Sequence, residues 1–320
     1  MKKKVLITGV VGFIGYSLAI KLLNENCHVI GVDNFDDYYS TKLKKKRLSQ
    51  LKKYSRFQIK VFNIEKYESF NIIKKYNFDH IFHLAAQAGV RYSAINPNKY
   101  IKTNILGTIN LFKFASTKKI KSIFFASSSS VYGDTKNKIK KEKELGNPLS
   151  PYAVTKVNNE SYAKIYSKLY NMKIIGLRYF NVFGYNQDQN SIYSAVIPKW
   201  IRLMKNDKII PIFGDGKNSR DFCYIENVIQ ANMLAALEKK IKNYEVFNVA
   251  VGNSTNLNQL FKLMSKIFKI KAAKKVHIKP RVGDVRYSTA DISKIRKILN
   301  YRPRFTINSG LKEISNQQKN

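Results

Sequence analysis

Two side chains that together could move a proton stand four residues apart in this sequence, Tyr152 and Lys156. In a helix this spacing places them on the same face. A phenol with a reference pKa near 10 is a poor base at neutral pH, but a nearby ammonium group favours the phenolate and lowers that pKa. The pair therefore predicts a general acid–base centre. The chain contains 20 tyrosines and is rich in lysine, so the spacing alone is common by chance and its context must decide.

A hydroxyl group that could join this centre precedes it along the chain. Ser128 stands at the end of a predicted strand, residues 122–127, within a run of serines at 127–130. Its hydroxyl could share the proton network of a substrate alcohol. A serine run is also an ordinary polar turn at a strand end, so the pattern leaves open which of these serines acts.

A glycine-rich turn near the N-terminus supplies the context. Gly9, Gly12 and Gly15 follow the predicted strand 3–8 and open a predicted helix. In dinucleotide-binding folds the first glycine permits the tight turn, the second lets the backbone approach a pyrophosphate, and the third lets helix and strand pack closely. The N-terminus of the helix then faces the phosphate charge. The alternative is a plain turn.

A carboxylate at the end of the second predicted strand indicates which dinucleotide would bind. Asp33 is placed to accept hydrogen bonds from an adenosine ribose diol, and its charge would repel a 2′-phosphate. NAD is therefore favoured over NADP, although an aspartate at this place can also simply cap a turn. Two further strand ends carry small or apolar residues that could line an adenine and ribose groove: Asn63, Ile64, Leu84, Ala85 and Ala86.

The elements that must hold these groups alternate along the first half of the chain. The predicted strands are 3–8, 28–33, 57–63, 80–84, 122–127 and 173–178, and the predicted helices are 13–24, 41–53, 67–76, 100–118 and 152–170. Repeated strand–helix–strand units give right-handed crossovers, and strands that are apolar without alternation are typical of a sheet buried on both faces. We therefore predict an α/β fold, a Rossmann-type doubly wound parallel sheet with a smaller mixed α/β C-terminal lobe for the substrate.

The regular alternation of predicted strands and helices ends at about Gly184, after which the predicted elements are shorter and the loops longer. We divide the chain approximately into a dinucleotide-binding domain over residues 1–184 and a substrate-binding lobe over residues 185–320, with the two interleaved. A ligand would then lie between them, at the carboxyl ends of the parallel strands.

Composition excludes several classes of protein. With 44% hydrophobic residues in 320 the chain is not disordered, and two cysteines cannot form a disulfide scaffold, which favours a reducing, cytoplasmic compartment. The net charge of +37 comes mainly from dispersed lysines. We expect a solvated surface and no nucleic-acid partner, with a polyanion site as the alternative. Glycines interrupt the apolar run at 5–20, so neither a signal peptide nor a membrane segment is predicted, and no metal site is predicted.

Taken together, these residues resemble an extended short-chain dehydrogenase/reductase, specifically a nucleotide-sugar 4-epimerase. The resemblance covers residues from about 3 to 304. Related 4,6-dehydratases carry Thr-Asp-Glu where this chain has Ser128-Ser129-Ser130, so dehydration is not expected. Besides the glycine loop, Ser128, Tyr152 and Lys156, the matching motifs are His83-Leu84-Ala85-Ala86, Asn104-Ile105-Leu106-Gly107-Thr108, Asn147-Pro148-Leu149-Ser150-Pro151, Arg178-Tyr179-Phe180-Asn181-Val182-Phe183-Gly184, Arg220-Asp221-Phe222 and Gly283-Asp284-Val285-Arg286.

The resemblance implies a redox-neutral cycle on a UDP-sugar. Tyr152 would take the proton of the sugar 4-hydroxyl while C4 passes a hydride to NAD, and the 4-keto sugar would turn over and receive the hydride on its opposite face. Lys156 would hold the nicotinamide ribose. A homodimer through the helices at 100–118 and 152–170 is implied as well. The further implied contacts are, to the cofactor, Phe13, Ile14, Asn34, Asn104 and Tyr179 and, to the substrate, Ser128, Ser129, Asn181, Val196, Arg220, Arg281, Asp284 and Ser288.

Two sub-families compete for the identity of the sugar. Residues 33–39 and 85–93 resemble UDP-glucuronate 4-epimerases, whereas residues 193–200 and 219–227 are similar to bacterial UDP-N-acetylhexosamine 4-epimerases of surface-polysaccharide pathways. The choice between the two sugars depends on the residues expected around the sugar, because the first third of the chain mainly holds the cofactor.

Those residues favour an acetylated sugar. Ser288 is small at a gatekeeper position, which leaves space for an N-acetyl group, and Asp188 or a near neighbour replaces an arginine that glucuronate epimerases offer to the C6 carboxylate. Arg91 could supply a cation instead. We therefore expect UDP-GlcNAc and UDP-GalNAc, or their uronates, as substrates. The alternatives are UDP-glucuronate, other hexoses, an NAD-linked nucleotide-sugar dehydrogenase and a non-catalytic NAD-binding protein.

Overall fold

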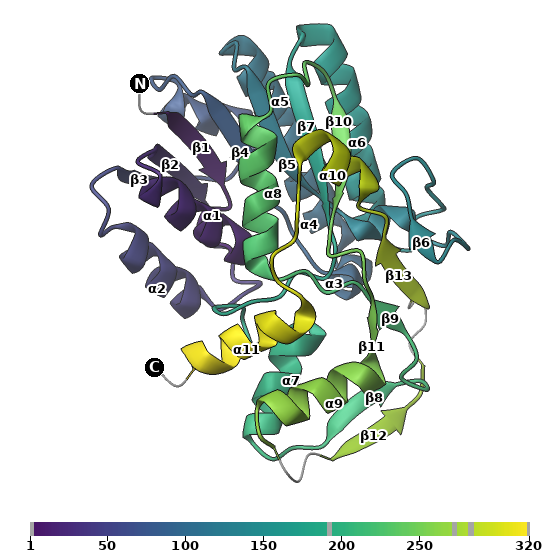
Figure 1. Cartoon of the computed structure of the whole chain (residues 1–320). Coiled ribbons are helices and arrows are strands. Elements are labelled where there is room, and N and C mark those ends of the chain that lie inside the picture. The colour runs from purple at the N-terminus through teal and green to yellow at the C-terminus, as the bar shows by residue number, and fades with distance from the viewer. Residues whose placement is uncertain (1–2, 191–193, 271–273, 281–284, 319–320) are drawn as a thin grey trace.

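A seven-stranded parallel sheet forms the centre of the molecule (Figure 1). The computed structural model describes residues 3–190, 194–270, 274–280 and 285–318. The strand order is β10-β7-β5-β4-β1-β2-β3, so the direction of winding reverses between β1 and β4, and a crevice is expected there at the carboxyl ends. The strands are β1 (Lys4–Thr8), β2 (His28–Asp33), β3 (Phe57–Val61), β4 (His80–His83), β5 (Ser122–Ser128), β7 (Lys173–Tyr179) and β10 (Glu245–Val249).

Helices cover both faces of this sheet. On one side α1 (Phe13–Asn24) packs beside α8 (Ile225–Leu237) and α2 (Thr41–Leu51). On the other side lie η1 (Tyr67–Ile73), α5 (Gly107–Thr117) and α6 (Pro151–Tyr170). Neighbouring residues of β5 belong to different buried clusters, Phe124 to the first and Phe125 to the second. This follows because successive side chains of a strand point to opposite faces.

The second half of the chain builds a smaller mixed layer beyond the carboxyl ends of the strands (Figure 1). One small sheet has the order β11-β9-β13-β6, and β12 pairs with β8 in another. The elements of this layer are β6 (Ile139–Lys140), α7 (Val196–Lys205), β8 (Ile210–Phe213), β9 (Ser219–Arg220), β11 (Thr255–Asn256), α9 (Leu257–Ile267), β12 (Lys275–Ile278), β13 (Tyr287–Ala290) and α11 (Ile307–Gln317). Helix α10 (Ser293–Leu299) returns to the large sheet, where it contacts β10 and α8.

The chain crosses between the two layers more than once. β6, from the first half of the sequence, pairs with β13 in the small sheet, whereas β10, from the second half, pairs with β7 in the large one. α8 also returns to the large sheet, where it contacts β5 and β7. A division of the chain near residue 184 therefore stays a prediction about function rather than a boundary between two separate bodies.

The predicted fold class is confirmed. Several predicted bounds differ from the observed ones by one to three residues, and two predicted helices differ in type. Residues 67–73 form a 3₁₀ helix, and the helix predicted at 100–118 is built from α4 (Pro97–Tyr100), a π-helical turn η2 (Ile101–Leu106) and α5. A short helix α3 (Val90–Ile95) and a 3₁₀ turn η3 (Ser129–Tyr132) complete the set. None of the described helices has the length and apolar character needed to traverse a lipid bilayer.

A buried ion pair ties α6 to the middle of the large sheet. The Arg178 guanidinium on β7 donates through Nε and Nη2 to the two carboxylate oxygens of Glu160 on α6, at 2.8 and 2.7 Å. Ser127 Oγ donates to the same carboxylate, and Tyr132 Oη accepts from Arg178 Nη1 at 2.9 Å. Ser127 and Arg178 are also register partners in the sheet. This network fixes the end of β5 relative to the helix that carries Tyr152 and Lys156.

Candidate active site

The glycine loop between β1 and α1 has the geometry that an anion site needs. Gly9 has φ +71°, in the left-handed region, and a Cβ there would lie 2.7 Å from the Ala85 nitrogen. A Cβ on Gly15 would lie 2.1 Å from the Gly9 oxygen, so only glycine permits this approach of helix and loop. Gly12 is the N-cap of α1 and offers no capping side chain. The first N–H groups of α1 therefore remain available to a phosphate.

Asp33 lies at the end of β2, beside this loop. It is buried, and its carboxylate accepts hydrogen bonds from the backbone N–H groups of Val11 at 3.2 Å and Phe35 at 2.9 Å. Lys44 of α2 is 3.8 Å away, and burial lowers the pKa of that lysine despite the attraction of Asp33. The carboxylate is thus held at the place where an adenosine ribose would meet it. Together with the glycine loop, these residues fit the adenosine and pyrophosphate of NAD.

A cavity of about 650 Å³ begins at the glycine loop and extends between the large sheet and the smaller layer. Its walls come from both parts of the chain, which matches the expectation that a ligand lies between them. The sequence-predicted residues that line it are Gly9, Gly12, Phe13, Ile14, Gly15, Asp33, Asn34, Asn63, Ile64, Leu84, Ala85, Ala86, Asn181, Val196 and Arg220.

The remaining predicted residues lie elsewhere. Arg281 and Asp284 fall outside the described residues, so nothing is said of their placement. Among the residues that the structure describes, the following predicted ones are not part of the cavity lining: Asn104, Ser128, Ser129, Tyr152, Lys156, Tyr179 and Ser288.

The three predicted catalytic residues come together directly behind one part of the cavity wall. Lys156 Nζ donates to the Ala126 carbonyl at 2.7 Å and lies 5.8 Å from the centre of the Tyr152 ring. Ala126 itself lines the cavity. Ser128, at the end of β5, hydrogen-bonds the Tyr152 hydroxyl. Helix α6 brings its first turn here because Pro151 occupies its first position and the Ser150 side chain caps it.

The protonation of this group differs from the sequence-based expectation. Burial raises the pKa of Tyr152, and this outweighs the hydrogen bond with Ser128, which lowers it. Lys156 is not among the groups that lower the pKa of Tyr152, and its ammonium group donates to the Ala126 carbonyl. Burial also lowers the pKa of Lys156 to about 8, although Glu160 one turn along α6 opposes the shift. Burial therefore disfavours the charged form of both Tyr152 and Lys156.

Asn104 and Tyr179 hold parts of the site in place. Asn104 lies in the π-helical turn η2, where its amide donates to the Gln87 carbonyl and to Thr155 Oγ1, both at 3.0 Å. It thereby joins the wall residue Gln87 to the helix that carries Tyr152. The Tyr179 hydroxyl is hydrogen-bonded to Asn232 of α8. Both side chains are buried in contacts within the protein.

The substrate side of the cavity is organised around the strand pair β9 and β13. Ser288 is the register partner of Arg220, and its carbonyl accepts from the Asp221 N–H at 2.8 Å. The Asp221 carboxylate accepts from the N–H groups of Val251 and Gly252 at 3.0 and 2.9 Å, and burial raises its pKa to about 6. Ser288 is buried and does not itself line the cavity, whereas its register partner Arg220 does.

Several residues around the cavity were missed by the sequence analysis. Tyr38, Tyr39, Lys44 and Arg47 line it, and they belong to the segment after β2 and to α2. Arg47 is buried, and its guanidinium donates to the carbonyls of Val11 in the glycine loop and Asn186 on the opposite side. The sequence signal for the two tyrosines was the resemblance of residues 33–39 to UDP-glucuronate 4-epimerases, whereas Lys44 and Arg47 lie within the predicted helix 41–53 and had no signal of their own.

Comparisons with known proteins agree with this geometry. The model of the NAD dependent epimerase/dehydratase family matches residues 5–250. The UDP-glucuronate 4-epimerase of Thermodesulfobacterium geofontis is 37% identical over 317 residues, which are 98% of this chain and 95% of that protein. The UDP-N-acetylglucosamine 4-epimerase of Methanobrevibacter ruminantium, solved with UDP-N-acetylmuramic acid, superposes with a TM-score of 0.90 at 36% identity, covering 100% of this chain and 99% of the other. A variant of the UDP-glucuronic acid 4-epimerase of Bacillus cereus, solved with a fluorinated UDP-glucuronic acid and NAD, has a TM-score of 0.91 at 33% identity, with 99% of each chain covered.

Proposed function

The chain belongs to the NAD-dependent epimerase/dehydratase family, and we propose that it is a UDP-sugar 4-epimerase whose preferred substrates are UDP-N-acetylhexosamines. One observation carries the proposal, namely that Ser128, Tyr152 and Lys156 meet behind the wall of a cavity that begins at the dinucleotide loop. Similar proteins act on UDP-glucuronate and on UDP-N-acetylglucosamine, as their names state. A cytoplasmic location and a role in surface-polysaccharide precursor synthesis are parts of the same proposal.

The residues of this chain divide the work of the reaction. The glycine loop and Asp33 would hold NAD, which would supply the hydride acceptor for C4. Tyr152 takes the proton of the sugar 4-hydroxyl and returns a proton to O4 when the hydride comes back to the opposite face of C4, and Ser128 shares that proton through its hydrogen bond with Tyr152. Lys156 places a positive charge beside the phenol. Asn181 and Arg220 on the other side of the cavity suit the UDP diphosphate, and Arg281 and Asp284 remain proposed contacts.

Two features support an N-acetylhexosamine over a uronate. Ser288 is a small, buried residue whose register partner Arg220 lines the cavity, and a small side chain at this position is expected in an enzyme that accepts an acetamido group. Asp188 lies on the cavity wall where a glucuronate would need a cation. A cation is nearby, since the Asp188 charge acts to raise the pKa of the Arg47 guanidinium.

The deciding experiment is product analysis with UDP-GlcNAc, UDP-glucose and UDP-glucuronate side by side. UDP-GlcNAc should be epimerised fastest; a preference for UDP-glucuronate would overturn the assignment of the sugar, and net NADH formation with any of them would indicate a dehydrogenase.

The burial of Tyr152 and Lys156 predicts a characteristic pH profile of the reaction. The reactive state is a Tyr152 phenolate beside a Lys156 ammonium group, so the two side chains together carry one titratable proton. We expect kcat/KM to rise with pH until the pair loses its first proton near pH 8, the pKa of Lys156, and then to level off. In Lys156→Met the phenolate must form unaided, so slower turnover should continue to rise above pH 8, because burial raises the pKa of Tyr152. A wild-type profile that is flat from acid to alkaline pH would contradict this scheme.

A homodimer is the expected assembly, and its proposed interface is an exposed apolar surface on η2 and α6. Ile101, Leu106, Val154, Ile165 and Leu169 are all exposed there, and a groove between α4 and α6 is lined almost entirely by apolar atoms. A second copy of the chain would bury this surface. Light scattering coupled to size-exclusion chromatography should give the mass of two chains, and Val154→Lys should give one; a monomeric wild-type protein would remove this part of the proposal.

A further inference from the structure

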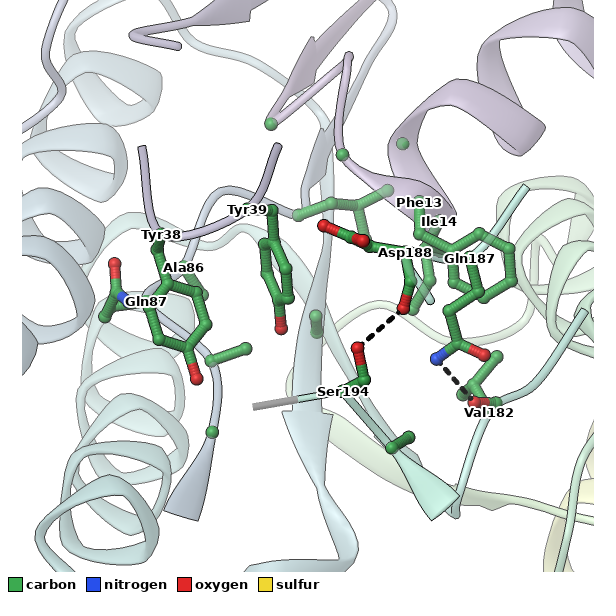
Figure 2. A pocket seen from close by; sticks show the side chains of 18 of the residues that line it. Phe13, Ile14, Tyr38, Tyr39, Ala86, Gln87, Val182, Gln187, Asp188 and Ser194 are labelled. Atoms are coloured by element: carbon green, nitrogen blue, oxygen red, sulfur yellow. Dashed lines mark hydrogen bonds between the residues drawn. The ribbon is translucent and has the colours of Figure 1, made fainter. Parts of the chain in front are cut away.

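Two tyrosines that the reaction scheme does not use project into the cavity (Figure 2). Tyr38 and Tyr39 belong to residues 34–40, the segment between Asp33 and α2, which we call the strap. Figure 2 shows their rings side by side, with the Tyr39 hydroxyl pointing into the cavity between Tyr38 and Asp188. The two ring centres are 4.6 Å apart and meet edge to face.

The strap is anchored on the dinucleotide side of the cavity. Asp36 forms an ion pair with Lys99 of α4 at 2.7 Å, and its carbonyl accepts from Lys44 Nζ at 2.7 Å. The Tyr38 ring packs 5.1 Å from the ring of Tyr92 on α3. A Cβ on Gly89, the N-cap of α3, would lie 2.1 Å from the Tyr38 hydroxyl oxygen, so this glycine makes room for the tyrosine.

The strap is also tied to the opposite wall. The Ser40 N–H donates to Asp188 Oδ2 at 3.1 Å, and Asp188 Oδ1 accepts from the Asn190 N–H at 2.9 Å. Both carboxylate oxygens therefore bind backbone groups, and Asp188 is buried. The strap thus bridges the cavity from the wall that holds Asp33 to the wall that holds Asp188.

Tyr39 lies near the catalytic phenol but cannot replace it as a base. Burial raises the pKa of Tyr39, and the neighbouring phenols of Tyr38 and Tyr152 raise it further. Its hydroxyl stays protonated at neutral pH, so the side chain offers an apolar ring with one neutral polar group. Such a side chain can cover a sugar without taking part in proton transfer.

An epimerase of the proposed kind has a particular need for a cover. The oxidised sugar must detach from one orientation and present its other face before the hydride returns, so the cavity must allow rotation while preventing escape. If the 4-keto sugar leaves, the two electrons removed from C4 stay on the cofactor as NADH. One NADH is then formed for each sugar that is lost, and the enzyme cannot complete its cycle.

We propose that the strap is the cover that retains the 4-keto sugar, with Tyr39 as the positioning residue over the sugar ring and Asp188 as the tether of the strap. The inference rests on the proposed function. It gives Asp188 a second role beside that of a charge that disfavours a uronate, namely as the acceptor that holds Ser40, and this second role can be tested separately.

The first experiment compares Tyr39→Ala with Tyr39→Phe and with Asp37→Asn, an exposed strap residue, as the control. Released keto sugar is separated from protein, reduced with borodeuteride and counted by mass spectrometry, while NADH on the protein is followed by absorbance. We expect Tyr39→Ala to release about tenfold more keto sugar per epimerised product, with NADH rising in equal amount, and the other two variants to match the wild type. Equal release from Tyr39→Ala and wild type would overturn the role of Tyr39.

A binding measurement tests the cover without turnover. By calorimetry, Tyr39→Ala should bind UDP-GlcNAc about tenfold more weakly than the wild type and UDP equally well, because the ring covers the sugar and not the nucleotide. Equal loss for both ligands, or no loss, would overturn the assignment. Should the wild type fail to epimerise any UDP-sugar, the proposed function would fall, whereas this comparison would still decide whether Tyr39 covers the sugar.

Asp188→Asn separates the tether from a charge filter. As a tether, Asp188 acts on every substrate, so the variant should release keto sugar from UDP-GlcNAc as Tyr39→Ala does. As a charge filter, the variant would gain activity on UDP-glucuronate and release no more keto sugar than the wild type, and that result would overturn the tether.

Discussion

Tyr152→Phe is expected to lower turnover by about 10²- to 10⁴-fold, the range that a positioned general acid–base group typically contributes. The change deletes one oxygen atom. The Tyr152 ring keeps its packing against Tyr100, whose ring centre is 6.1 Å away, so the fold should remain intact. Turnover should be measured as product formed from UDP-GlcNAc, and binding of UDP by calorimetry should be unchanged. Only the proton transfer is then removed.

Tyr54→Phe is a suitable control for this variant. It deletes the same atom from an exposed hydrogen bond with Asn24, far along the chain from the site, and its turnover should equal that of the wild type. A Tyr152→Phe enzyme that works at near the wild-type rate would remove this residue from the mechanism. A loss of thermal stability in Tyr152→Phe would instead assign the effect to folding.

Glu160→Ala is expected to destabilise the protein by about 3–5 kcal/mol, because it leaves the buried Arg178 guanidinium without its carboxylate. Arg178 is only 2% exposed, and water cannot replace the two lost acceptors. Two hydrogen bonds from Arg178 and one from Ser127 disappear together. The variant should unfold at a markedly lower urea concentration, as followed by circular dichroism.

The control for this prediction is another carboxylate with a cation partner, at the C-terminal end of α1. Glu25, the C-cap of α1, pairs with Lys21 at 2.8 Å, but both side chains are about half exposed. Glu25→Ala should change stability by less than about 1 kcal/mol, since exposed pairs contribute little. If both variants lost the same stability, the ion pair between Glu160 and Arg178 would have no special role in holding α6 on the sheet.

The features that could be predicted from the sequence are those that local pattern determines. The bounds of β2 and α1 match the prediction, because an unbroken apolar run and a helical periodicity each end at a clear signal. The glycine loop was predictable because glycine is required where a Cβ would collide with backbone, as at Gly15. Ser128 and Tyr152 were predictable as partners because one ends a strand and the other begins the helix beside it.

The features that escaped prediction depend on contacts between distant segments. The strap crosses the cavity only because Asp188, 148 residues later, accepts from Ser40. The π-helical turn around Asn104 depends on hydrogen bonds from its amide to Gln87 and Thr155. The raised pKa of Tyr152 is caused by burial, which the spacing of Tyr152 and Lys156 does not report. Each of these features depends on residues that become neighbours only in the folded chain, so the local sequence pattern cannot predict it.

The pairing of β10 with β7 and of β6 with β13 limits how the specificity of such an enzyme can be transplanted. A chimaera joined near residue 184 would exchange not only the sugar-facing walls but also an edge strand of the cofactor sheet, and it would leave β6 beside a foreign partner. Grafts that move residues 139–140 together with 185–224 and 251–292 would keep β6 paired with its own β13, and would leave β10 and α8 with their native neighbours. In this architecture the residues that determine substrate preference therefore lie in separate segments of the sequence. A chimaera with a single crossover point is expected to assemble incorrectly.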